Sequence, residues 1–588
     1  MIWQAWLTLG VIAGVFCVLV FTRYAADVVT LAALGVLLAA GVLTPQQALA
    51  GFSNEGLMTV AVLFVVAAAL RETGGMARVA QRILGVPTTV LAAQLRLMLP
   101  IAAMSAFMNN TPLVAMMLPV VDDWTRKARI SASKLMIPLS YATILGGTCT
   151  LIGTSTNLVV DGLLIRSDRP GFGMFEIGWV GLPSAILGLA FVIGAGRWLL
   201  PDRKAVVSVQ DDARQYTVEM LVEPGSPLVG QSIEEAGLRR LPGMFLIEID
   251  RQGDVLAAVG PEERLRASDR LVFAGVVESV VDLQKIRGLT PATNQVFKLD
   301  QPRERRAMIE AVVSNSCPLI GKTVRESEFR SVYDAVIIAL ARNGELVRKK
   351  IGDIELRSGD TLLLEARPSF AKDQRNSRDF FLVSRLEEGA IPRHRKAWIA
   401  VAILVGMVTA ATLNLLPMLT AAVLAAGLMI GTRCVDWVVA RRAVDLQVVL
   451  VIAATFGLGT ALEVTGAAKT IAEGLVRLGG SDPWATLVVV YGVTMLFTEL
   501  ITNNAAAALI FPIALATADS LQVEFRPFAI AITMAASASF ATPIGYQTNL
   551  MVLGPGGYRF TDYFRIGIPL NLLMWLMASL LIPRIWSF

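Results

Sequence analysis

The sequence is poor in the residues from which most catalytic and metal centres are built. Its 588 residues include one histidine, His394, which lies in the basic run 393–396. The four cysteines stand far apart, without the CxxC spacing of a zinc site or the pattern of a disulfide framework. Because no nucleophile–histidine pairing and no Walker A motif are available, we expect neither an enzyme nor an ATP-driven pump, and no organic cofactor is indicated.

Charged residues are also scarce. They make up 17% of the chain, whereas a typical soluble domain carries about 25%. Hydrophobic residues make up 55%, and several windows approach the ~20 apolar residues that span a bilayer. The net charge of +5 is too small to indicate a nucleic-acid partner. We therefore expect a polytopic protein of the lipid bilayer. Residues 1–22 lack a basic n-region, so we interpret them as a first span rather than a signal peptide.

The apolar segments form two sets with the same order. The first set, within residues 1–200, has three spans, a hairpin-like pair near 87–122, an interrupted span and a final span. The second set, within residues 397–588, repeats this order with its hairpin near 483–520. We expect an α-helical fold built as an inverted repeat, with five crossings and one re-entrant hairpin in each half. An odd number of crossings reverses the orientation of the second half.

A short polar motif occurs once in each half. Residues 150–158 (TLIGTSTNL) reappear as residues 542–550 (TPIGYQTNL), a shift of 392 positions. The pair Asn109-Asn110, at the turn of the first hairpin, corresponds to Asn503-Asn504 in the second. Matching polar breaks in two hydrophobic halves are the best sequence pointer to the binding site of a transporter.

These residue types suit the binding of ions. Hairpin tips and broken helices free backbone carbonyls, and Asn and Thr side chains add hard oxygen ligands for a small cation. The helix N-termini at the same breaks turn amide N–H groups inward, which favours an anion beside the cation. Helix packing is the alternative explanation, because small and hydroxyl residues commonly line contacts between membrane helices. Taken singly, it remains open for Thr154, Ser155, Thr156, Gln547 and Thr548.

Two carboxylates fall inside the apolar segments. Glu499 lies in an arm of the second hairpin, where the first hairpin has Ala106. A carboxylate at membrane depth is costly and is therefore a functional candidate, here for coupling to a proton or a cation. Asp161 follows the first break by one helical turn, and it could equally lie at the membrane interface.

The middle of the chain, residues 201–396, has a different composition. Short apolar strands alternate with polar turns, and residues 226–230 (SPLVG) return as residues 317–321 (CPLIG), a shift of 91. We expect two tandem α+β domains, at 205–290 and 297–386. The basic run that follows them predicts a cytoplasmic location.

The tips and breaks resemble those of the divalent anion:sodium symporter family, within the ion transporter superfamily of inverted-repeat carriers. Members have Ser-Asn-Thr tips and Gly-Thr-Pro-Pro-Asn-like breaks. The resemblance implies one sodium site with Asn109, Asn110 and Gly153, and a second with Thr502, Asn503 and Gly545. It implies that the hairpin tips face the substrate, and the full substrate site that we predict comprises Asn110, Thr111, Thr154, Ser155, Thr156, Asn157, Asn503, Asn504, Gln547, Thr548 and Asn549.

This chain departs from the family pattern at two points. Its second tip reads Thr502-Asn503-Asn504, and the paired prolines are absent from both breaks. These departures argue against a dicarboxylate substrate and leave the second sodium site in question.

The two middle domains resemble the C-terminal domain of TrkA-type potassium-uptake regulators (RCK-C). The resemblance implies a regulatory pair at 205–386 that binds a small-ligand effector or dimerises. Relatives that join this pair to this membrane fold are associated with sulfate uptake. The expectation is thus a sodium-coupled sulfate carrier of the bacterial inner membrane, a homodimer that works by an elevator motion. A dicarboxylate or arsenite carrier and a sodium/proton exchanger remain open. A channel gated by the RCK-like domains would need a selectivity filter such as TVGYG, which the sequence lacks.

Overall fold

The computed structural model describes most of the chain. The described residues are 3–22, 24–73, 84–85, 87, 89–128, 130–203, 217–238, 244–251, 254–257, 262–275, 286–291, 307–314, 317–342, 345–347, 349, 351–367, 370, 374, 377, 379–385, 396–480, 482–543 and 545–588. His394 and the rest of the basic run up to residue 395 lie outside them.

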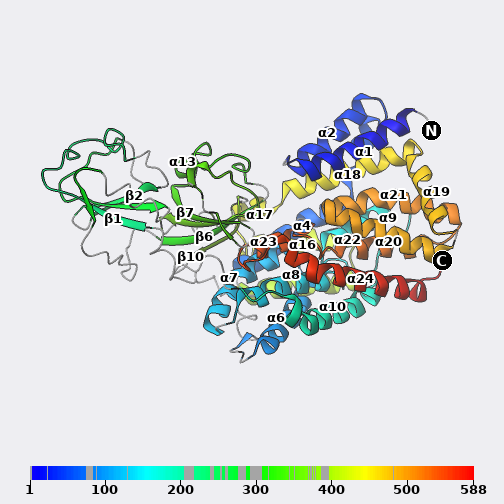
Figure 1. Ribbon diagram of the computed structural model, residues 1–588. Coiled ribbons are helices and arrows are strands. Elements are labelled where there is room, and N and C mark those ends of the chain that lie inside the picture. The colour runs from blue at the N-terminus through cyan, green and yellow to red at the C-terminus, as the bar shows by residue number, and fades with distance from the viewer. Residues whose placement is uncertain are drawn as a thin grey trace. The chain divides into compact units, whose positions relative to one another are not determined.

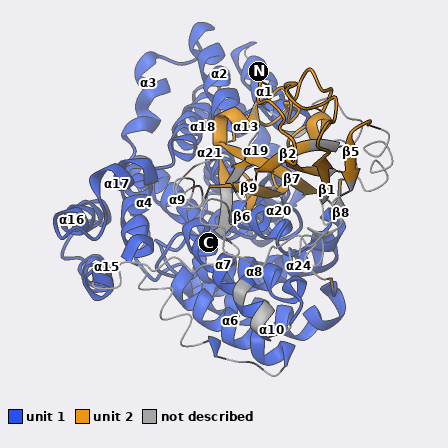
Figure 2. Ribbon diagram, turned by 90° about the vertical axis from the view of Figure 1, so that its left-hand side faces the viewer, with its two compact units in different colours: residues 1–202, 391–588 blue, residues 203–390 orange. Residues whose placement is uncertain are grey.

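The chain divides into two compact units (Figure 2). Residues 1–202 and 391–588 together form a helical unit, and residues 203–390 form a strand unit. The division follows composition, because the two apolar stretches pack with each other and the polar middle folds by itself.

The first half of the helical unit follows the predicted spans closely. Its first helix packs against the second helix and against α18 of the second half, as Figure 1 shows. The helices are α1 (Trp3–Phe21), α2 (Ala26–Ala39), α3 (Pro45–Leu49), α4 (Glu55–Thr73), α6 (Val90–Ser105), α7 (Asn110–Ala128), α8 (Met136–Gly147), α9 (Ser155–Arg166) and α10 (Gly178–Leu199).

The second half repeats this order, with the short α17 in the place of α3, and it includes a short helix, α19, that the sequence did not predict. The helices are α15 (Ala397–Thr412), α16 (Met418–Gly431), α17 (Trp437–Ala443), α18 (Leu446–Val464), α19 (Ala467–Leu478), α20 (Pro483–Leu500), α21 (Asn503–Leu521), α22 (Arg526–Ser537), α23 (Gln547–Leu553) and α24 (Phe560–Ile585). The unpredicted α19 is amphipathic. It buries Ala468 and Ala472 and exposes Lys469, Glu473 and Arg477.

Six helical stretches among the described residues are long and apolar enough to cross a membrane. They are 45–73, 178–199, 446–464, 483–500, 503–521 and 560–585. Five shorter apolar helices accompany them, including both halves of the α15–α16 pair. This composition is that of a polytopic membrane protein.

The helices of the two halves interlock at the breaks. Within each half, one arm of the hairpin packs along the first part of the broken helix, α6 on α8 and α20 on α22. Between halves, α9 packs against α21 and α23 packs against α7. The second part of each broken helix therefore contacts the hairpin of the other half, which brings both tips and both breaks together.

The strand unit contains two five-stranded antiparallel sheets. The first has the order β3-β2-β4-β1-β5 and the second β8-β7-β9-β6-β10, which is the same plan 91 residues later. Their register agrees as well, because Met220 faces Leu271 and Ala311 faces Leu362. The strands are β1 (Thr217–Val222), β2 (Met244–Arg251), β3 (Asp254–Ala257), β4 (Arg270–Gly275), β5 (Leu289–Pro291), β6 (Ala307–Val313), β7 (Ala335–Arg342), β8 (Glu345–Leu346), β9 (Thr361–Ala366) and β10 (Phe380–Arg385).

Each sheet holds the same buried ion pair. Arg251 Nε lies 3.0 Å from Asp269 Oδ1 in the first sheet, and Arg342 Nη2 lies 2.7 Å from Asp360 Oδ2 in the second. Both aspartates are almost fully buried and also accept a backbone N–H from three residues earlier. The pair thus secures the same turn in both sheets.

Candidate functional site

The predicted site residues lie in four non-helical segments and the helix starts that follow them. The two tips lie between α6 and α7 and between α20 and α21, and the two breaks lie between α8 and α9 and between α22 and α23. Most of the predicted side chains are buried, which fits a site enclosed by protein. Half-buried are Asn109, Thr111, Ser155, Asn503 and Gln547, and Thr502 is exposed.

An asparagine organises each break from within. Asn157 Nδ2 donates to the carbonyl oxygens of Gly147 at 3.3 Å and Thr150 at 2.7 Å. Asn549 Nδ2 donates to those of Ser539 at 3.0 Å and Thr542 at 3.2 Å. The four carbonyls correspond under the shift of 392. Both breaks therefore use one amide to satisfy carbonyls that a continuous helix would have bonded.

Hydroxyl groups tie each hairpin to the break of its own half. Ser105 Oγ donates to the carbonyl of Thr143 at 2.7 Å, and Thr498 Oγ1 donates to that of Ala536 at 2.8 Å. These two contacts correspond under a shift of 393. The Thr150 hydroxyl likewise donates to the backbone carbonyl of Ala106. In the second half, the Thr542 hydroxyl donates to the backbone carbonyl of Glu499.

The tip of each half contacts the break of the other half. Thr111 Oγ1 donates to Gln547 Oε1 at 3.0 Å, and Ser155 Oγ donates to Asn504 Oδ1 at 3.1 Å. These contacts also correspond between the halves. A further bond of 2.8 Å joins Asn503 Nδ2 to the Thr156 hydroxyl. These contacts define a tip–break cluster of six predicted substrate residues, Thr111, Ser155, Thr156, Asn503, Asn504 and Gln547. Thr548 and Asn549 instead bond to Ser140 of α8, and Asn157 bonds within its own break.

Tyr546 joins this cluster, although it is not among the predicted site residues. Its hydroxyl lies 2.6 Å from the Asn110 amide and 3.1 Å from the Thr154 hydroxyl. The best orientation of Asn110 has Nδ2 donating to the carbonyls of Thr143 and Gly153, so that Oδ1 accepts from Tyr546. The only sequence signal was a large residue at the position that Thr154 occupies in the first break.

The first break and tip form a cradle of neutral oxygens. A Cβ atom on Gly147 would lie within 3.0 Å of the Asn110 amide group, and one on Gly153 would lie 2.5 Å from the Gly147 carbonyl oxygen, so glycine is needed at both places. Asn157 Oδ1 is buried and has no hydrogen-bond partner in the part of the chain that the structure describes. Freed carbonyls and an unpaired amide oxygen fit a sodium ion.

The second cradle is similar but not identical. A Cβ on Gly545 would lie 2.8 Å from the Thr498 carbonyl oxygen and would also meet the Ser539 hydroxyl. The buried hydroxyls of Ser537 and Ser539 have no partner among the described residues. In contrast to Asn157, Asn549 has both ends of its amide bonded, because its Oδ1 accepts from Ser140 at 2.7 Å.

A family model described as a citrate transporter matches residues 16–535. The chain belongs to this citrate transporter family. A protein of Chlamydomonas reinhardtii named putative sulfur deprivation response regulator is 36% identical over 568 residues, which cover 93% of this chain and 96% of that protein.

Two further relatives from the same alga carry more specific names. Sodium/sulfate cotransporter 2 is 26% identical over 789 residues, covering 99% of this chain and 89% of its own length. Probable sodium/sulfate cotransporter 3 is 29% identical over 750 residues, covering 92% and 84%. The family and these names indicate a transporter rather than an enzyme.

In this transporter, Glu499 is bonded into the second break. Its Oε1 accepts the backbone N–H of Ala541 at 2.9 Å and Asn571 Nδ2 at 2.7 Å. Its Oε2 accepts the N–H of Thr542 at 2.9 Å. The carboxylate thus accepts hydrogen bonds from backbone N–H groups of the non-helical break between α22 and α23.

Asp161 serves the loop that follows α9, and no hydrogen bond joins it to the tips among the described residues. Its Oδ1 accepts the N–H of Phe172 at 2.6 Å. The same loop is held by Arg526, the first residue of α22, through Glu176. Asp161 therefore stabilises the connection between α9 and α10.

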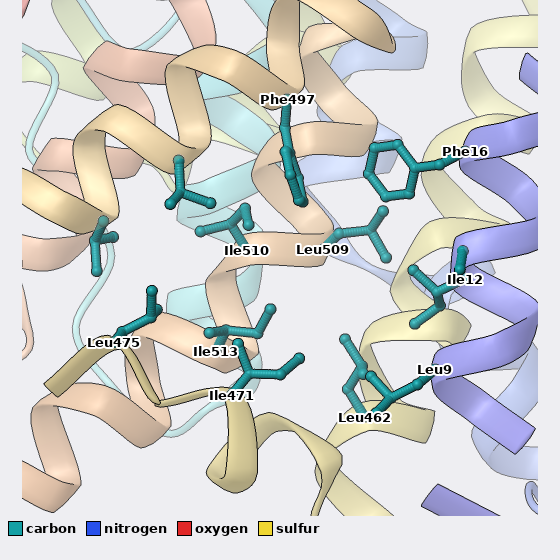
Figure 3. A pocket seen from close by; sticks show the side chains of 13 residues that line it. Leu9, Ile12, Phe16, Leu462, Ile471, Leu475, Phe497, Leu509, Ile510 and Ile513 are labelled. Atoms are coloured by element: carbon teal, nitrogen blue, oxygen red, sulfur yellow. The ribbon is translucent and has the colours of Figure 1, made fainter. Parts of the chain in front are cut away.

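An apolar cavity of about 250 Å³ lies between α1 and the arms of the second hairpin (Figure 3). Carbon side chains such as Phe16, Ile471 and Leu509 surround it, and none of the tip or break residues lines it. Such a lining offers nothing to an ion, so the cavity is separate from the candidate site.

Proposed function

We propose that the chain is a secondary active transporter that works by alternating access. It takes up a small divalent oxyanion together with sodium, and sulfate is the substrate that we propose. The observation that carries the proposal is the set of paired contacts in which each tip touches the opposite break, as in Thr111–Gln547 and Ser155–Asn504. A site shared by two similar halves can open to either side when one half rocks against the other.

The proposed ion sites use the two cradles. Sodium would be held by Asn109, Asn110 and Gly153 in one, and by Thr502, Asn503 and Gly545 in the other. Asn110 and Asn503 would also face the anion. The other proposed substrate residues are Thr111, Thr154, Ser155, Thr156, Asn157, Asn504, Gln547, Thr548 and Asn549.

An anion here would be held without a positively charged side chain, since neither tip and neither break contains Lys or Arg. Helices α7, α9 and α21 begin at the cluster, at Asn110, Ser155 and Asn503. Their N-terminal N–H groups favour a negative charge, each contribution being roughly 0.3–1 kcal/mol near a helix end. Bound sodium supplies the rest of the compensating charge, which is the physical reason for coupling.

The proposal extends to the coupling ion, the cellular location and the oligomeric state. The relatives named as sodium/sulfate cotransporters support sodium and sulfate. We place the transporter in the bacterial inner membrane as a homodimer. The strand unit is then a cytoplasmic pair of RCK-C-like domains that takes a small-ligand effector, a reading supported by two sheets with one strand plan.

Sodium/proton exchange is the less favoured function. It would use Glu499 as the proton carrier, but that carboxylate accepts three hydrogen bonds in the second break. Protonation of Glu499 in each transport cycle would have to disrupt these hydrogen bonds.

The test is uptake of radiolabelled sulfate into proteoliposomes with and without an inward sodium gradient, with succinate as cold competitor. We expect sodium-dependent uptake that succinate does not inhibit. Asn110→Ala and Asn503→Ala should each abolish it, while Ser520→Ala, at the exposed end of α21, should not. Undiminished uptake in both asparagine variants would refute the site, and succinate or proton flux in place of sulfate would refute the substrate.

A further inference from the structure

Thr154 and Tyr546 occupy corresponding positions of the two breaks, and they contact each other. The shift of 392 that relates the breaks carries position 154 onto 546, and the two hydroxyl oxygens lie 3.1 Å apart. A contact between counterparts can form only where the two halves meet. The Tyr546 side chain therefore lies where an anion shared by both halves would have to bind.

We infer that Tyr546 determines which anions the site accepts: its ring limits the site to compact tetrahedral dianions, and its hydroxyl donates a hydrogen bond to them. This inference rests on the proposed function. The tyrosine is 6% exposed, so its ring fills space within the cluster. The corresponding residue of the first break, Thr154, is small and is itself buried.

The hydroxyl has a hydrogen atom to offer. A tyrosine hydroxyl donates one bond and accepts others. It donates to Asn110 Oδ1, whose amide nitrogen is already directed at the carbonyls of Thr143 and Gly153. An entering oxyanion is a stronger acceptor than an amide oxygen. Rotation about the C–O bond can redirect the hydrogen, and the Thr154 hydroxyl can rotate in the same way.

Size exclusion follows from the ring rather than from the hydroxyl. A tetrahedral dianion carries its charge on one centre and can bind beside the ring. A dicarboxylate carries two charged ends separated by carbon atoms, so it needs space on both sides of the meeting point. Sites that hydrogen-bond their substrate in a closed space discriminate strongly against ligands that leave a buried polar group unpaired.

Two variants separate these roles. Tyr546→Phe keeps the ring and removes the donor, so it should weaken sulfate uptake on the order of tenfold or more, as expected for a hydrogen bond to a charged group, and still exclude succinate. Tyr546→Thr copies the first break and removes the ring, so succinate should compete with sulfate at least tenfold more strongly than in the unaltered transporter.

The matched control is Tyr491→Phe in α20. Tyr491 is a fully buried tyrosine whose hydroxyl has no partner among the described residues, so its loss should leave sulfate and succinate competition unchanged. Binding of sulfate and succinate to purified protein in sodium, measured by calorimetry, is the second readout and does not depend on transport.

The outcomes distinguish the inference from the function on which it rests. Sodium-driven sulfate uptake by the unaltered transporter, with Tyr546→Thr as selective as before, would overturn the inference and leave the function intact. Absence of that uptake would refute the function. Unaltered protein that binds succinate as tightly as sulfate, or binds neither, would overturn the inference by calorimetry alone.

Discussion

Asn157 and Asn549, 392 positions apart, donate to equivalent pairs of backbone carbonyls. Asn549 Oδ1 also accepts from Ser140, whereas Asn157 Oδ1 has no partner among the residues that the structure describes. Replacing either with alanine leaves two carbonyls without that donor. Each buried group left unsatisfied costs about 1–3 kcal/mol. We expect both variants to lower the unfolding temperature of the detergent-purified transporter, and we expect Ser520→Ala not to do so.

The difference between the two asparagines should appear in the response to sodium. A ligand that binds only the folded state raises its stability, so sodium should raise the unfolding temperature of the unaltered protein. Asn157→Ala should lose most of that increase, whereas Asn549→Ala should keep it. An equal response in both variants would count against Asn157 Oδ1 as a sodium ligand.

Glu499→Gln should damage the second break although it replaces only one heavy atom. Its carboxylate accepts backbone N–H groups on both oxygens, and a glutamine would turn its own NH₂ toward one of these donors. The loss should be about 1–3 kcal/mol of stability, with reduced uptake at every pH tested. Glu524→Gln, at an exposed ion pair, is the control. Normal stability with loss of only the pH dependence of uptake would instead favour a proton carrier.

Much of the helical unit was predictable because apolar length and polar breaks are visible in the sequence. The helix starts at Asn110 and Asn503 agree with the predicted hairpin tips. The bonding of the polar residues was not predictable. Nothing in the sequence distinguishes Asn157, which holds its own break, from Asn504, which accepts from the other half.

The omissions have the same cause. In the sequence, Tyr546 resembles any other large residue of a break. Only the structure shows that its hydroxyl bonds to the Asn110 amide. In the sequence, Glu499 is an isolated charge. Only the structure shows that it accepts the N–H of Ala541, in the break that follows α22. The amphipathic α19 is too short and too polar on one face to register as a span.

Arg526 should not be replaceable by lysine. Its guanidinium bonds both oxygens of Glu176 at 2.8 and 2.5 Å and the carbonyl oxygens of Pro170 and Gly171. Lysine is a point donor and cannot reproduce this planar geometry. Both side chains of the pair are about one-fifth exposed, so we expect a modest loss of about 1–2 kcal/mol after solvent screening.

A double-mutant cycle with Arg526→Lys and Glu176→Gln tests that contact by thermal unfolding. The two effects should be less than additive, because each variant removes the same pair of bonds. Strict additivity would show that Arg526 acts through the loop carbonyls rather than through Glu176.

The repeated ion pair of the strand unit allows a matched test within one chain. Asp269→Asn should weaken only the first sheet and Asp360→Asn only the second, since each removes the buried carboxylate of its pair. Arg251 keeps Glu263 as a second carboxylate partner at 2.7 Å, so the effect in the first sheet should be the smaller one. Breaking a buried pair costs about 3–5 kcal/mol, and the partly exposed arginines should reduce this. Hydrogen exchange of the full chain should quicken in β2 and β4 in one variant and in β7 and β9 in the other. Exchange that quickens in both sheets at once would mean that they unfold together.

The contact between positions 154 and 546 also constrains how the two halves can diverge. A residue that touches its own counterpart is part of that counterpart's surroundings, so neither position can change alone. Two tyrosines would compete for the same space, and two threonines would leave it empty. If the halves descend from one duplicated segment, this is a place where they had to become unlike, one keeping a small hydroxyl residue and the other gaining a large one. The asymmetry of the transporter is therefore concentrated where its two halves touch.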